Sequence, residues 1–185
     1  NAFVWQVFEY KKRNQNEGIC VEIIKEWFKT IIYACIVVLI LYFFAWPVTI
    51  EGESMEPTFL DGDKVITSRV LTMAEKYDVG DIVVFHMVDS DGQRDVIKRV
   101  IGVAGDKIEI KNGVVYRNGT ALEEEYISGD TQGDISVIVP EKSLFVLGDN
   151  RAYSYDSRMI GSISQKDLKG KVIFRWYPFY HMGAF

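Results

Sequence analysis

Three short segments of this 185-residue chain carry residue types that could perform nucleophilic chemistry. In the first, Gly52–Thr58, glycine permits a close backbone approach and Pro57 fixes a turn, so Ser54 could be presented on a sharp bend. Serine in a loop of this composition is more often a plain turn residue. The segment alone therefore leaves both interpretations open.

The second segment, Asp95–Gly102, is a short apolar run with a basic pair in its middle. Alternation with period two puts Val96, Lys98 and Val100 on one face of a strand, where branched apolar side chains would surround an ammonium group. An outward-facing lysine on an edge strand is the commoner arrangement. A desolvated lysine can lose its proton and act as a base, so the orientation of Lys98 decides whether this strand has a chemical role.

The third segment, Gly148–Arg158, is a polar loop of a kind that often only closes a turn. The two histidines, His86 and His181, have no neighbours with metal-ligand spacing, and His86 lies in an alternating strand. A Ser-His-Asp triad is therefore poorly supported. Any serine chemistry needs another base, and no metal site is expected.

Together, and in this order, the three segments resemble type I signal peptidases of bacteria, a family of membrane-bound serine proteases. The resemblance is carried by Gly-x-Ser-Met-x-Pro-Thr at Gly52–Thr58, by Lys98-Arg99, and by Gly-Asp-Asn-Arg-x-x-Ser-x-Asp-Ser-Arg at Gly148–Arg158. It covers nearly all of residues 50–178 and the uncharged run before them. The modest length is similar to that of the Gram-positive enzymes, although Phe59 stands where leucine is commoner.

The resemblance implies a Ser-Lys dyad that works through an acyl-enzyme, with Ser54 as nucleophile and Lys98 as general base. It assigns to Ser154 a hydrogen bond that positions the lysine, and to Asp156 and Arg158 an ion pair that supports the loop. Lysine has an ordinary pKa near 10.4, which must fall by roughly 2–3 units for this role, and desolvation could lower it. No metal or other cofactor is expected.

The resemblance also implies how the oxyanion and the substrate are held. The Ser54 N–H is one expected oxyanion donor, and the second belongs at Gly52, where some family members have a serine hydroxyl and this chain needs a backbone N–H or a water. The substrate is expected to bind extended, as a strand beside Asp95–Ile97 and Ile50–Glu53, with alanine one and three residues before the cut. The expected pocket residues are Ile50, Met55, Phe59, Val96 and Ile97.

A run of 21 residues without charge, Thr30–Ile50, would span about 31 Å as a helix and is predicted to cross a membrane. The basic residues are unevenly distributed around it: Lys11, Lys12, Arg13, Lys25 and Lys29 precede it, and only Lys64 and Arg69 occur in the twenty residues that follow. This excess predicts a cytoplasmic N-terminus. The expected organisation is a cytoplasmic segment over 1–29, a single transmembrane helix over 30–50, and an extracytoplasmic β-rich peptidase domain over 51–185 in the plasma membrane.

After residue 50 the apolar runs are short and bounded by turn residues. They predict strands at Lys64–Ile66, Asp81–His86, Val96–Ile101, Lys107–Ile110, Val114–Tyr116, Ser143–Leu147 and Lys171–Tyr177. Asn112-Gly113 and Asn118-Gly119 suit type I′ hairpin turns. The expected fold class is mainly β, a signal-peptidase-like β-barrel or curled antiparallel sheets with one N-terminal transmembrane helix.

A net charge of −5 argues against a nucleic-acid binder, so the expected partners are preprotein signal peptides and membrane lipid, with the protein a monomer. The aromatic C-terminal region could touch the same membrane. Two other classes of protein compete with this interpretation. A self-cleaving repressor-type Ser-Lys protease is soluble and binds DNA, which the uncharged run and the acidic charge disfavour. A catalytically silent, anchored binding domain is disfavoured by Ser54, Lys98 and Ser154 occurring together.

Overall fold

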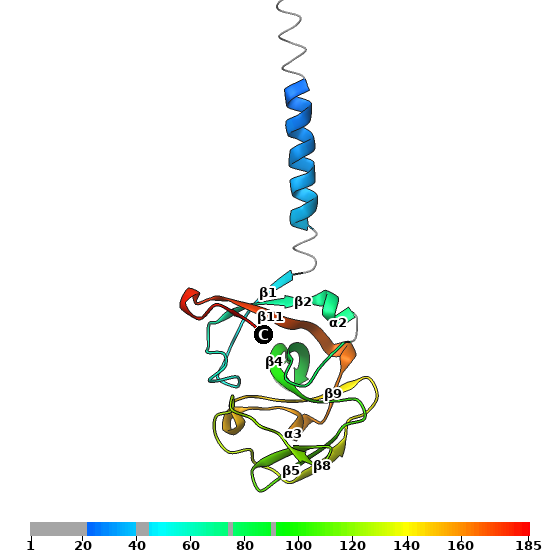
Figure 1. The fold of residues 1–185 in the computed structure, drawn as a ribbon, viewed down its shortest axis with the longest axis vertical. Helices are drawn as coiled ribbons and strands as arrows, with labels where there is room; N and C mark the ends of the chain where they lie inside the picture. The colour runs from blue at the N-terminus through cyan, green and yellow to red at the C-terminus, as the bar shows by residue number, and fades with distance from the viewer. Residues whose placement is uncertain (1–21, 40–44, 74–75, 90–91) are drawn as a thin grey trace, which may run out of the picture. The chain divides into compact units, whose positions relative to one another are not determined.

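The computed structural model describes residues 22–39, 45–73, 76–89 and 92–185 (Figure 1). The chain divides into two compact units, residues 1–43 and residues 44–185. The first contains a helix over residues 22–39, and the second contains every strand described below.

The transmembrane helix that we expect over residues 30–50 is only partly described. Residues 40–44 lie outside the described residues, as does the segment 1–21. Its expected end is wrong, because Ala45–Thr49 forms strand β1. Pro47 has no N–H and suits an edge strand, and the β-branched Val48 and Thr49 favour extended backbone.

Among the described helices, none is long and apolar enough to cross a membrane.

The second unit is built from two antiparallel sheets, which confirms the mainly β prediction. The larger has the order β1-β2-β11-β3-β4-β9-β10, with β12 on β11; the smaller has the order β7-β6-β5-β8. The strands of the larger sheet are β1, β2 (Lys64–Ser68), β3 (Ile82–Asp89), β4 (Gly92–Val103), β9 (Ser143–Leu147), β10 (Ile163–Ser164), β11 (Leu168–Tyr177) and β12 (Gly183–Ala184). Those of the smaller sheet are β5 (Lys107–Lys111), β6 (Val114–Arg117), β7 (Thr120–Ala121) and β8 (Ile135–Ile138).

Short helical segments connect these strands. The α-helices are α2 (Arg69–Met73) and α3 (Ser157–Ile160), and the 3₁₀ turns are η1 (Arg151–Tyr153), η2 (Gln165–Asp167) and η3 (Phe179–His181). The two Asn-Gly turns have the predicted geometry: Asn112 and Asn118 have φ 52°, and the glycines after them have φ 81° and 83°. Both central residues of a type I′ turn need positive φ, so these dipeptides determine the β5–β6 and β6–β7 hairpins.

Strand β4 contributes to more than one apolar cluster, which holds it in place. Ile97 packs with Ile50, Val65, Ile82, Val84 and Val172, whereas Val100 packs with Val83, Phe85, Leu144 and Val146. A third cluster joins the sheets, with Ile101, Phe145 and Leu147 against Ile108, Ile110 and Val115. The lysine of this strand is therefore carried by a rigid element.

Four successive antiparallel pairings connect β1 to β4 through β2, β11 and β3. Because each pairing reverses the strand direction, β1 and β4 run the same way. Strand β9 pairs with β4 only from Arg99 to Val103, and β1 pairs with β2. Among the described strands, none pairs with the first half of β4 on the side away from β3, and none pairs with β1 on the side away from β2.

Candidate functional site

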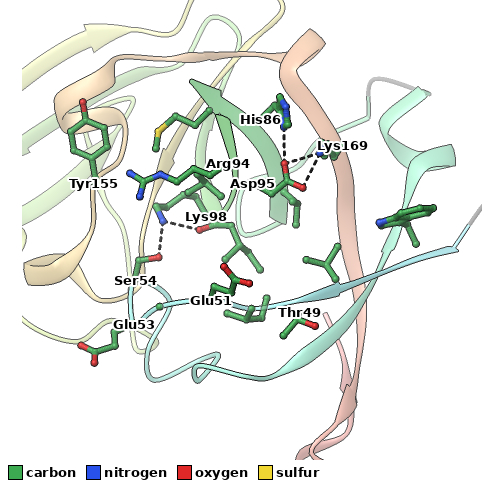
Figure 2. A pocket seen from close by; sticks show the side chains of 18 of the residues that line it. Thr49, Glu51, Glu53, Ser54, His86, Arg94, Asp95, Lys98, Tyr155 and Lys169 are labelled. Carbon is green, nitrogen blue, oxygen red and sulfur yellow. Dashed lines mark hydrogen bonds and ion pairs between the residues drawn. The ribbon is translucent and has the colours of Figure 1, made fainter. Parts of the chain in front are cut away.

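Ser54 and Lys98 come together from separate parts of the chain (Figure 2). Lys98 Nζ lies 2.7 Å from Ser54 Oγ and donates a hydrogen bond to the Ile97 carbonyl at 2.9 Å. The lysine is 2% exposed. The predicted burial among apolar neighbours is confirmed, and the outward-facing alternative is wrong.

Burial changes the chemistry of this lysine. It lowers the pKa of Lys98 from its ordinary 10.5 to about 8, because an ammonium group loses hydration inside the protein. The carboxylates of Asp156 and Asp149 raise this pKa, while Arg94 and Arg158 lower it further. Near neutral pH a useful fraction of the amine is therefore unprotonated and able to accept the Ser54 proton.

The loop that carries Ser54 is closed by backbone bonds and held by buried side chains. The Ile50 N–H donates to the Asp63 carbonyl at 2.7 Å, and the Gly62 N–H donates to the Ile50 carbonyl at 3.0 Å. Met55 and Phe59 are fully buried in the cluster that contains Ile97. These contacts position the serine beside β4.

Gly52 does not match its expected role as an oxyanion donor. Its φ of +84° suits glycine, but its N–H donates to Asp61 Oδ1 at 2.8 Å. The Asp61 carboxylate therefore already accepts from the Gly52 N–H, which would have to point at the oxyanion if Gly52 were a donor. The Ser54 N–H remains as a candidate donor.

The loop 148–158 packs directly against the serine. The Asn150 N–H donates to the Ser54 carbonyl and its amide Nδ2 to the Glu53 carbonyl, both at 3.1 Å. A methyl group on Gly148 would lie 2.2 Å from Ser154 Oγ and 2.5 Å from the Ser54 carbonyl oxygen. Only glycine lets the two segments approach this closely.

Ser154 is brought to the site, but its expected hydrogen bond is not formed. The residue is 5% exposed, and its Oγ makes no hydrogen bond of good geometry to a described residue, although it lies close enough to Asp156 to help lower the pKa of that carboxylate. Lys98 Nζ is bonded to Ser54 and to the Ile97 carbonyl instead, while the Ser154 side chain lies against Gly148. A buried, unpaired hydroxyl is uncommon and calls for an explanation.

Asp156 and Arg158 form the expected ion pair in this loop. Arg158 donates to Asp156 from Nε at 2.8 Å and from Nη2 at 2.9 Å, and the Gly148 N–H donates to the same carboxylate at 3.0 Å. Burial alone would raise the pKa of Asp156, but the hydrogen bonds from Arg158 and Gly148 hold it below its ordinary value. The carboxylate is therefore ionised and fixes the backbone next to Ser154.

Sequence reasoning missed a second buried ion pair behind the same loop. Arg151 is 1% exposed, and its guanidinium contacts both carboxylate oxygens of Glu124 at 2.5 and 3.0 Å and the Thr131 hydroxyl at 2.5 Å. Glu124 lies 27 residues away in the connection between β7 and β8, and no local pattern signals the contact.

A cleft of about 890 Å³ opens beside Ser54 and Lys98, between β1 and the first half of β4. Of the expected pocket residues, Ile50, Val96 and Ile97 line it. Met55 and Phe59 do not, because both are fully buried in the core. Other residues line the cleft that were not predicted from the sequence, among them Val48, Val84, Met87, Arg94, Tyr153 and Tyr155.

Comparisons with known proteins give one consistent family. The family described as "Signal peptidase, peptidase S26" matches residues 24–177. Signal peptidase IB of Staphylococcus aureus (strain COL) is 39% identical over 176 residues, which is 84% of this chain and 91% of that protein. Probable signal peptidase I-1 of Synechocystis sp. is 38% identical over 165 residues, 85% of this chain and 84% of that protein. A crystal structure of a signal peptidase I from Enterococcus faecalis V583 is 32% identical, covers 51% of this chain and 95% of its own, and has a TM-score of 0.45.

Proposed function

The chain belongs to the signal peptidase family S26, and from this premise we propose that Ser54 and Lys98 perform its reaction as nucleophile and general base. The protein is a serine endopeptidase that removes signal peptides from preproteins. The observation that carries the residue assignment is the 2.7 Å contact between Lys98 Nζ and Ser54 Oγ.

In the first half of the reaction, Ser54 Oγ attacks the carbonyl carbon of the residue before the cut, and its proton passes to the neutral amine of Lys98. The resulting ammonium then gives this proton to the leaving nitrogen as the C–N bond breaks. The mature protein leaves with a free amino terminus, and the signal peptide remains as an ester on Ser54.

In the second half, Lys98 is neutral again and takes a proton from a water molecule, which attacks the ester. Collapse of the second tetrahedral intermediate returns the proton to Ser54 Oγ and releases the signal peptide with a free carboxyl group. The Ser54 N–H supports the oxyanion in both halves. Because the Gly52 N–H is bonded to Asp61, we assign the second donor to a water molecule beside the glycine.

The edges of β1 and β4 along which no described strand pairs support binding of the substrate as an added strand. Ile50, Val96 and Ile97 then form shallow apolar walls, which suit alanine one and three residues before the cut. The cleft of about 890 Å³ has room for an extended peptide, and the side chains of these three wall residues are branched.

Ser154, Asp156 and Arg158 support the dyad in this proposal. The ion pair holds the loop backbone, and the loop holds Ser154 beside Gly148 and the Ser54 carbonyl. A buried hydroxyl without a partner is costly, and a role in positioning Lys98 during the reaction would explain its position.

We further propose that the protein is a single-pass plasma-membrane protein, with its N-terminus in the cytoplasm and the unit that carries Ser54 outside. A membrane location agrees with the family, and the basic residues before the uncharged run support this orientation. Large exposed apolar side chains near the C-terminus and on β1 support contact with the same lipid: Trp46, Tyr177, Phe179, Tyr180, Met182 and Phe185. Protease added to intact spheroplasts should digest the part beyond β1, and protection of that part would reverse the orientation.

Cleavage of a preprotein with an Ala-x-Ala site, in detergent or liposomes, tests the function. Ser54→Ala and Lys98→Ala should each abolish cleavage, because one removes the nucleophile and the other its base. Ser136→Ala and Lys166→Ala, at exposed positions outside the cleft, are matched controls and should cleave normally. Near-normal cleavage by Lys98→Ala would show that the dyad assignment is wrong.

A further inference from the structure

A cluster of three charged or titratable side chains lines the cleft away from the dyad. His86 of β3, Asp95 of β4 and Lys169 of β11 meet there (Figure 2). His86 Nδ1 lies 2.7 Å from Asp95 Oδ1, and Lys169 Nζ lies 2.7 Å from Oδ1 and 2.8 Å from Oδ2 of the same carboxylate. The three side chains are 31–41% exposed, so a bound peptide could reach them. The dyad does not use any of them.

The hydrogen bonds of the cluster determine what it can still bind. Although partial burial would raise the pKa of Asp95, the hydrogen bonds from Lys169 and His86 lower it, so the carboxylate is ionised. An ionised carboxylate only accepts, and His86 Nδ1 must therefore be the donor in its bond to Asp95. This leaves one N–H of Lys169 as a donor and His86 Nε2 as an acceptor while the ring is neutral. A side chain amide, which both accepts and donates, fits this pair of groups.

The facing side of this part of the cleft is polar as well. Strand β1 and the residue pair after it contribute Thr49 and Glu51, both exposed and both on the cleft. Figure 2 shows Thr49 and Glu51 on the lower strand, with Asp95 and Lys169 on the upper side. Ile50, Val84 and Ile97, in contrast, give the cleft its apolar wall. The cleft therefore has an apolar part and a polar part.

The directions of β1 and β4 indicate which residues of the substrate lie beside the cluster of His86, Asp95 and Lys169. Asp95 precedes Lys98 by three residues, about 10 Å along an extended strand, and β1 and β4 run the same way toward the dyad. The cluster thus lies at the end of the cleft where β1 begins. With a signal peptide paired parallel to β1 and β4 and its cut site at Ser54, the residues before the cut lie beside the cluster.

We propose that His86, Asp95 and Lys169 form a specificity subsite for an amide or hydroxyl side chain of the signal peptide, about four or five residues before the cut. This inference rests on the proposed function, since it concerns the same cleft and the same substrate. The subsite adds a preference for a polar side chain in the signal peptide to the preference for small side chains next to the cut.

Peptide substrates with an Ala-x-Ala site test the subsite. In one series the residue five before the cut is Gln or Met, which have similar length, and a second series varies the residue four before the cut. The unaltered protein should show a kcat/KM for the Gln peptide about fivefold above that for the Met peptide in one of the series, as expected for one gained hydrogen bond. Lys169→Met should reduce this ratio to about one, mainly through KM.

Lys171→Met is the matched control. Lys171 lies two residues further along β11 and also pairs with an aspartate, Asp81, at 2.6 Å, but it is outside the cleft. The Lys171→Met protein should keep the fivefold ratio of kcat/KM between the Gln and Met peptides. Cleavage of both peptides with no Gln preference, or a preference that Lys169→Met leaves intact, would overturn the subsite and leave the proposed function standing. Failure of the unaltered protein to cut any Ala-x-Ala peptide or preprotein would instead count against the proposed function.

Discussion

The Arg99 guanidinium holds the Asp149 carboxylate in a two-point contact, from Nε to Oδ1 at 2.8 Å and from Nη2 to Oδ2 at 2.6 Å. Thr58 donates to the same carboxylate at 2.5 Å. These residues belong to the strand of Lys98, the loop of Ser154 and the loop of Ser54. One buried network therefore fixes the three segments of the site to one another.

Asp149→Asn tests this network. Asp149 is fully buried and the Arg99 side chain is 11% exposed, so the change leaves an almost unsolvated guanidinium without its countercharge. We expect the free energy of unfolding to fall by about 2–4 kcal/mol and kcat/KM to fall at least tenfold, measured by urea unfolding and peptide cleavage. Glu109→Gln, which removes a partly exposed carboxylate paired with the exposed Lys107 and Lys111, should change both quantities far less. Equal stability of Asp149→Asn and the unaltered protein would contradict the role of the network.

Gly148→Ala tests the close approach of the two loops. The added methyl group would lie 2.2 Å from Ser154 Oγ and 2.5 Å from the Ser54 carbonyl oxygen, so one loop must move. We expect kcat to fall roughly 100-fold or more, because a displacement of about 1 Å at the nucleophile costs that much. Gly183→Ala is the control, since a methyl group there meets nothing within 4 Å and its φ is not in the left-handed region. If Gly148→Ala cleaves as fast as this control, the approach does not position the nucleophile.

The parts of the structure that the sequence predicted are those determined by the types of neighbouring residues. The two Asn-Gly turns needed only the φ preference of two residues, and the strand of Lys98 needed only alternation with Val96 and Val100. The pairing of Ser54 with Lys98, which are 44 residues apart, was implied by the resemblance to a known family and has no local signal.

The parts that sequence did not predict depend on partners far along the chain. Strand β1 ends an uncharged run that looks continuous, and its pairing with β2 adds to the local preference of Val48 and Thr49 for extended backbone. The Gly52 N–H is occupied because Asp61 folds back onto it, nine residues later. Met55 and Phe59 were expected in the cleft because they are apolar and near Ser54, but the same property buries them in the core.

Lys98→Met tests how much stability the buried base costs. Burial lowers the pKa of Lys98 from 10.5 to about 8, so between these pH values the unfolded chain binds the extra proton and the free energy of unfolding rises with pH. At pH 7 the folded protein holds a mostly charged, buried amine. Removing it should raise the free energy of unfolding by about 1–3 kcal/mol while abolishing cleavage.

The gain in the free energy of unfolding from Lys98→Met should shrink as the pH rises from 8 to 10.5. Over this range Lys98 of the unaltered protein becomes neutral first in the folded state and then in the unfolded state. Urea unfolding at pH 7 and at pH 10.5 measures the difference. Lys166→Met, at an exposed position, should not change stability at either pH. A Lys98→Met protein that is less stable than the unaltered one at pH 7 would show that burial of the ammonium group is not the dominant cost.

The pH dependence of kcat/KM reports directly on the base, because only the neutral amine of Lys98 accepts the Ser54 proton. With a pKa of about 8, about one-tenth of the free enzyme is active at pH 7 and about nine-tenths at pH 9, so kcat/KM should rise close to tenfold between them. The charge of Arg94 lowers this pKa, so Arg94→Gln should move the rising limb to higher pH. Arg117 lies on β6 of the smaller sheet and pairs with Asp106. Arg117→Gln removes this positive charge and should leave the rising limb of the pH profile in place. A limb centred near pH 6.5, or one that Arg94→Gln moves to lower pH, would mean that a group other than Lys98 titrates in the rate.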